Sequence, residues 1–231
     1  MNYFDNNKNV YDVSSRTQVD VQSFVSRVFA MMGFGLLVTG VVAFMTLNIT
    51  PLLKVAYQGF WLFAIVEIGL VIYLSRKFTA MPAQTAMIWF LTYAGLNGLT
   101  LAPLLYMYTH ASIVSAFVVS AGMFGGMAVW GLTSKKDLTS IGSLCFMGLL
   151  GLILASVVNM FLQNSATQLI ISYAGVAIFI GLTAYDAQRI KMMGSSPSAT
   201  GNMAVMGALM LYLDFINIFV YILQILGSRR N

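Results

Sequence analysis

Long apolar stretches separated by short polar breaks follow one another along almost the whole chain. The pattern predicts seven helices, at residues 24–47, 57–74, 83–108, 112–132, 141–162, 168–188 and 203–227. A helix of about 20 residues rises about 30 Å, which matches the hydrocarbon thickness of a bilayer. The predicted fold is therefore an all-α integral membrane protein, a bundle of seven transmembrane helices.

The first 23 residues differ from the rest because they are polar and carry charges of both signs. They lack the leading apolar core of a cleavable signal peptide. We therefore expect residues 1–23 to form a short, poorly ordered cytoplasmic tail. Residues 24–231 should form a single transmembrane domain.

Composition narrows the class further, since 59% of the 231 residues are hydrophobic and only 8% are charged. These values exclude soluble proteins. A single cysteine, Cys145, excludes an intrachain disulfide and cysteine-based metal sites. The net charge of +5 comes from basic residues at the ends of apolar stretches. The expected partner of these residues is the lipid bilayer, and nothing indicates nucleic-acid binding.

The basic residues also predict an orientation. The side that holds the N-terminus carries nine: Lys8, Arg16, Arg27, Arg76, Lys77, Lys135, Lys136, Arg189 and Lys191. The other side carries three: Lys54, Arg229 and Arg230. Cytoplasmic loops are the ones enriched in Lys and Arg, so we expect the N-terminus to be cytoplasmic and the C-terminus to lie outside.

Glycines recur within two of the spans, at Gly33, Gly35 and Gly40 in the first and at Gly122 and Gly126 in the fourth. Small residues let helices approach closely in lipid. They indicate packing inside one bundle or, alternatively, a dimer interface.

Three acidic residues lie inside predicted spans: Glu67, Asp186 and Asp214. An ionised carboxylate at bilayer depth costs at least roughly 2.5 kcal/mol, so each is a candidate functional residue. Asp214 shares one helix face with Asn217, and Arg189 lies one turn beyond Asp186. We expect the three acids to line one half-cavity that opens to the cytoplasm.

If Asp186 and Asp214 meet, the two carboxyl groups should share a proton, because two like charges in low dielectric cannot both ionise cheaply. Such a pair would sense pH, and its deprotonation would push the last two helices apart. The exposed oxygens suit transient passage of Ca²⁺, although with Asn217 they are too few for a storage site. No cofactor is expected.

Structural interpretations of the same acids stay open. Asp186 with Arg189 is also typical of a salt-bridged helix end. Asp214 could have a purely structural role, hydrogen-bonded to a Tyr or Asn side chain. Glu67 could pair with a basic residue such as Arg27. His110 and the sixteen methionines carry no functional signal of their own.

Three segments carry a resemblance to a known family: AGMFGGMAVWGLTSKKDL, GLTAYDAQRIK and GALMLYLDFINIFVYILQILG. They resemble the Bax-inhibitor family, the transmembrane Bax inhibitor motif proteins, especially bacterial members of the YbhL type. The resemblance implies six helices around a central seventh and a pH-sensitive Ca²⁺ leak in the inner membrane. It maps the family's aspartate pair onto Asp186 and Asp214, its second-helix acid onto Glu67, and its gating arginine approximately onto Arg76.

Other functions remain as alternatives to the leak. Some family members modulate a membrane quality-control protease or bind other membrane proteins without conducting ions. An intramembrane aspartyl protease is disfavoured, since Leu211 and Leu213 stand where such enzymes have the glycines of Gly-x-Gly-Asp. A retinal receptor is disfavoured because the last span has no lysine. We therefore expect a protein that is not an enzyme.

Overall fold

The computed structural model describes residues 5–196, 199–228 and 230, with side chains from residue 20 onward except that of Thr79. All regular elements in this part of the chain are helical. In chain order they are α1 (Asp5–Asn48), α2 (Thr50–Gln58), α3 (Phe60–Lys77), the 3-10 turn η1 (Phe78–Ala80), α4 (Ala83–Tyr106), α5 (His110–Thr133), α6 (Thr139–Leu162), α7 (Ser165–Gly194) and α8 (Gly201–Leu226). The predicted all-α class is confirmed.

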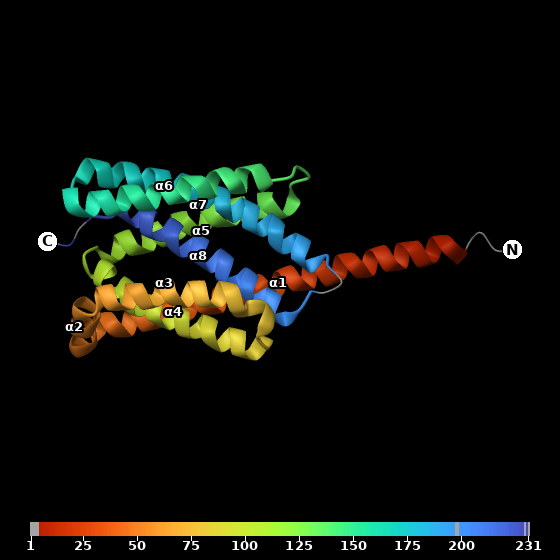
Figure 1. Cartoon of the computed structure of the whole chain (residues 1–231), viewed down its shortest axis with the longest axis horizontal. Coiled ribbons are helices and arrows are strands. Elements are labelled where there is room, and N and C mark those ends of the chain that lie inside the picture. The colour runs from red at the N-terminus through yellow and green to blue at the C-terminus, as the bar shows by residue number, and fades with distance from the viewer. Residues whose placement is uncertain (1–4, 197–198, 229, 231) are drawn as a thin grey trace.

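The first helix is longer than the sequence pattern predicts. It begins at Asp5 and runs without a break to Asn48, so residues 5–23 are helical rather than a poorly ordered tail, while residues 1–4 of the predicted tail lie outside the described residues. No Gly or Pro occurs between Asp5 and Ser23, and a helix already formed in the membrane span extends at little cost. Figure 1 shows this end of α1 projecting beyond the other helices.

The predicted second span is divided. The short helix α2 and the longer α3 meet at Gly59 with a bend of 72°. The Gly59 amide ends α2 by donating to the Val55 carbonyl at 2.8 Å, and the Phe63 ring packs where a side chain at position 59 would lie. Within the described residues, six helices are long and apolar enough to cross a membrane, or seven if the bent pair counts as one span.

The helices form two groups with α8 between them (Figure 1). One group contains α1 to α4 and the other contains α5 to α7, and α8 packs against α1, α4, α5 and α7. In its most apolar window α8 is 56% buried, whereas the corresponding window of α6 is 11% buried. The core of the molecule is therefore built on α8, and α6 lies at the periphery.

The glycines predicted to pack do so at only one position. The backbone of Gly35 is covered by the Phe90 ring of α4. Gly33, Gly40, Gly122 and Gly126 have no described atom within 4 Å of where a β-carbon would lie. The closest helix contact is made instead by Gly131 of α5, which lies against the backbone carbonyl of Ala184 in α7.

Candidate functional site

The two aspartates lie on α7 and α8, which pack along each other. Asp186 is half-buried and Asp214 is only 4% exposed. The two carboxyl groups interact electrostatically, and no hydrogen bond joins them. The Asp214 Oδ2 atom is buried without any hydrogen-bond partner. A buried carboxyl oxygen normally has a partner, so this atom is an exception that points to a role beyond packing.

A cavity of about 410 Å³ lies beside Asp186, between α6 and α7. Asp186 and Arg189 are its charged lining residues, and Met210 of α8 also lines it. Asp214 follows Met210 by one helical turn on the same face of α8. The cavity therefore exposes Asp186 directly, while Asp214 lies one turn further along α8.

Few charged groups surround this pair. Arg189 acts electrostatically on Asp186, but the two side chains form no ion pair in the described part of the chain. Asp214 interacts with the thiol of Cys145 on α6. A salt bridge to Arg189 is therefore not what holds Asp186 in place.

Glu67 has different partners. Its Oε1 accepts a hydrogen bond from the Thr100 hydroxyl at 2.6 Å, and its Oε2 accepts one from the Asn97 amide at 3.2 Å. Arg27 is exposed, and Glu67 forms no ion pair with any described residue. The neutral donors on α4 thus replace the basic partner that the sequence left open.

The hydrogen bonds continue from Asn97 across the core. The Tyr212 hydroxyl of α8 donates to Asn97 Oδ1 at 3.0 Å and lies 2.6 Å from the Thr39 hydroxyl of α1. Tyr212 and Asp214 are two residues apart on α8, so they lie on nearly opposite faces of this helix. Glu67 therefore belongs to a network on the α1 and α4 side of α8, and the structure does not bring it to the aspartates.

Of the two remaining predicted residues, Asn217 has a hydrogen-bond partner and Arg76 has none among the described residues. Asn217 donates its amide to the Leu213 carbonyl of its own helix at 2.8 Å. Arg76 is exposed in the last turn of α3 and has no hydrogen bond or ion pair with a described residue. The gating role implied for Arg76 stays a prediction.

Gln188 is a site residue that the sequence analysis missed. Its side-chain oxygen accepts from the Leu138 amide at 2.9 Å, and its nitrogen donates to the Lys136 carbonyl at 2.8 Å. Lys191 adds a hydrogen bond to the Leu132 carbonyl at 2.7 Å. These bonds hold the connection between α5 and α6 against α7, two residues from Asp186. The sequence feature that could have identified Gln188 is its position, two residues after Asp186 in the YDAQ segment.

Asp137 lies in this connection and stabilises its turn. Its Oδ1 accepts from the hydroxyl of Thr139 at 2.6 Å and from the Thr139 amide at 2.9 Å. These two hydrogen bonds hold the pKa of the exposed Asp137 carboxyl below its usual range. Asp137 therefore carries its charge at all pH values near neutrality.

The Gln188→Ala variant should release the α5–α6 connection, because it removes both hydrogen bonds between this side chain and the loop. We expect trypsin to cleave after Lys135 or Lys136 at least roughly fivefold faster in the detergent-solubilised protein, since local opening costs less free energy. Gln58→Ala changes an exposed glutamine at the end of α2 and serves as the control. Equal cleavage rates in both variants would contradict the clamp.

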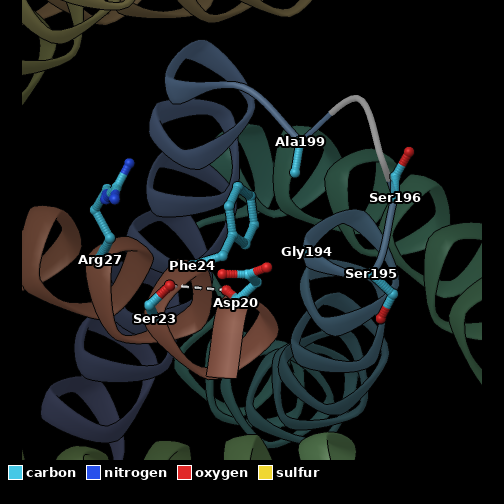
Figure 2. Close-up of a pocket in the computed structure, with 8 residues that line it drawn as sticks. All are labelled: Asp20, Ser23, Phe24, Arg27, Gly194, Ser195, Ser196 and Ala199. Carbon is cyan, nitrogen blue, oxygen red and sulfur yellow. Dashed lines mark hydrogen bonds between the residues drawn. The ribbon is translucent and has the colours of Figure 1, made fainter. Parts of the chain in front are cut away.

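A second hollow, of about 470 Å³, lies where α1 meets the end of α7. Figure 2 shows Asp20, Ser23 and Phe24 of α1 on one side and Gly194 and Ser195 on the other, with Arg27 directed away. The Ser23 hydroxyl donates to the Asp20 carbonyl at 2.9 Å, within its own helix. This hollow shares no residue with the aspartate cavity.

Comparison with known proteins identifies the family. The family described as inhibitor of apoptosis-promoting Bax1 matches residues 21–231. Inner membrane protein YbhL of Escherichia coli K12 is 41% identical over 218 residues, which cover 91% of this chain and 93% of YbhL. A Borreliella burgdorferi protein is 42% identical over 215 residues (90% and 93%), and the Rickettsia prowazekii protein RP147 is 38% identical over 216 residues (91% and 92%). The resemblance noted in the sequence is confirmed, and the chain belongs to the Bax inhibitor family.

Proposed function

We propose that this protein is a passive, pH-sensitive Ca²⁺ leak of the inner membrane, with Asp186 and Asp214 as proton sensor and transient ion ligands. The observation that carries the proposal is the buried Asp214 carboxyl, which has an unpartnered oxygen and interacts electrostatically with Asp186. Two like charges that interact in a low-dielectric interior favour a state in which the pair holds one proton. The pair then changes its charge with pH at the α7–α8 contact.

Loss of the shared proton is the opening step of the proposed mechanism. Two ionised carboxylates repel each other, and the repulsion favours separation of α7 from α8. The freed oxygens are hard ligands, which suit Ca²⁺. The described residues include no group of three or more His, Cys, Asp or Glu side chains that could hold a metal ion. Two carboxylates alone suit an ion that passes through rather than one that stays.

The proposed orientation follows the basic residues. We treat α2 and α3 as one bent span, so that the chain crosses the membrane seven times around α8. The connections after α3, α5 and α7 then share the end of the bundle at which α1 begins (Figure 1). Nine of the twelve Lys and Arg residues lie in α1, in these connections or near the helix ends that adjoin them, which favours a cytoplasmic N-terminus and an external C-terminus.

Calcium flux into proteoliposomes tests this proposal directly. Purified protein is reconstituted with a Ca²⁺-sensitive dye inside, and flux is measured from pH 6 to pH 8 against protein-free vesicles. We expect slow Ca²⁺ entry that increases with pH, because deprotonation of the pair favours the open state. Flux no greater than in protein-free vesicles at every pH would contradict the proposal.

A further inference from the structure

A large apolar cavity lies at the opposite end of the bundle from the aspartate cavity. Its volume is about 810 Å³, and its walls come from α1, α4, α5 and α8. Most of its lining side chains are aliphatic or aromatic. Its size falls within the range of roughly 300–1,000 Å³ typical of small-molecule sites. None of the proposed site residues lines it.

The cavity exists because α1 and α5 both pack on α8 but barely contact each other. Nearer the aspartate end of the bundle, Phe29 of α1 and Phe124 of α5 close the space between these two helices. Their ring centroids lie 6.4 Å apart. Beyond this contact the space between the two helices stays open, and Phe117 and Phe215 pack edge to face in its wall. Gly40 of α1 lines the cavity and has no described atom within 4 Å of where a β-carbon would lie.

One cation is fixed at the mouth of this cavity. Arg230 lines it, with its guanidinium 5.9 Å from the centre of the Tyr106 ring. The Arg230 amide donates to the Met107 carbonyl at 2.9 Å, which ties the end of the chain to the connection between α4 and α5. A neighbouring hydrogen bond from the Thr109 amide to the Ser228 carbonyl, at 3.1 Å, strengthens this pairing. Among the described residues, none of those that line the cavity is acidic.

The side of the cavity faces the membrane. Phe44, Val114 and Phe117 line it and are 68%, 62% and 49% exposed. An apolar space of this kind gives water too few partners to fill it. Its natural occupant is an acyl chain that enters sideways from the bilayer, and the mouth cation favours a negatively charged headgroup.

We propose that this cavity is a binding site for one anionic phospholipid, with an acyl chain between α1 and α5 and the phosphate at Arg230. The site is independent of the proposed Ca²⁺ leak, because it shares no residue with the aspartates. A basic residue near a lipid phosphate contributes about a fivefold change in affinity. The lipid affinity therefore has two parts that can be measured separately, one from the charge of Arg230 and one from the shape of the cavity.

Native mass spectrometry of the full-length protein in detergent tests both. Phosphatidylglycerol and phosphatidylcholine with the same acyl chains are titrated separately. We expect one phosphatidylglycerol to bind about fivefold more tightly than phosphatidylcholine, consistent with one additional basic contact. Arg230→Gln should reduce that preference to about one. Gly40→Phe should place a ring inside the cavity and weaken binding of both lipids by at least roughly tenfold, as expected when a preformed pocket is obstructed.

Two control variants make the result specific. Gly33→Phe adds the same ring on α1 where space is also open but outside the cavity, and Arg76→Gln removes a cation at the other end of the bundle. Both should bind lipid like the unmodified protein. Equal binding of the two lipids, or equal losses from Gly40→Phe and Gly33→Phe, would show ordinary boundary lipid and overturn the proposal. So would a second protein chain bound in place of the lipid. If Gly40→Phe fails to fold, the Arg230→Gln preference still decides the outcome.

Discussion

Replacing Asp214 with asparagine should abolish the pH response of Ca²⁺ flux in proteoliposomes. Asparagine keeps the shape of the side chain but carries no charge, so Asp186 loses the like charge that faces it. The repulsion that favours separation of α7 and α8 is then absent at every pH. We expect flux at pH 8 to fall to the level at pH 6, at least roughly a tenfold loss if the repulsion is worth about 1.4 kcal/mol. Flux measured from pH 6 to pH 8 checks this.

Asp137→Asn is the matched control, since it makes the same chemical change at an exposed carboxylate in the α5–α6 connection. Hydrogen bonds from Thr139 lower the pKa of Asp137, so its charge does not change in this range. Its removal should leave the pH profile unaltered. Asp186→Asn, in contrast, should reproduce the effect of Asp214→Asn. A pH response that survives in Asp214→Asn would refute the sensor role of the pair.

The largest loss of stability is expected from Gly131→Ala. A β-carbon at this position would collide with the backbone carbonyl of Ala184, which cannot rotate away as a side chain can. Either α5 must move away from α7 or the contact must be strained, and overpacking of this kind costs about 3 kcal/mol. Thermal unfolding of the protein in detergent should show a clearly lower melting temperature.

Gly126→Ala provides the comparison on the same helix. No described atom lies within 4 Å of its added methyl group, so only the helix propensity changes. Alanine is favoured over glycine inside a helix by up to about 1 kcal/mol, and this variant should be as stable as the original or slightly more stable. Equal melting temperatures for the two variants would mean that the α5–α7 contact is looser than described.

Hydropathy was sufficient to predict most of the spans, because an apolar segment in lipid must satisfy its backbone hydrogen bonds internally as a helix. It could not predict that α1 extends back to Asp5, since polarity does not prevent a helix when no Gly or Pro breaks it. The bend at Gly59 was also missed. An isolated glycine in an apolar stretch does not show whether the chain bends or continues, and the Phe63 ring that packs over it becomes known only in the fold.

Part of the candidate site was also predictable from the sequence. Asp186 and Asp214 were recognisable because charge is costly inside a membrane. The partners of Glu67 were not, since Asn97, Thr100 and Tyr212 lie on two other helices whose relative rotation the sequence does not show. A buried acid can be found from one sequence, but its hydrogen-bond donors require the packed structure.

The pairing of the chain end with the α4–α5 connection should guide how the protein is produced. A purification tag fused after the last residue would place bulky chain beside Ser228 and Arg230 and compete with their hydrogen bonds to Thr109 and Met107. A tag at the other terminus would precede α1, whose first part projects past the bundle (Figure 1). Recombinant protein for the lipid and flux measurements should therefore carry its tag at the N-terminus.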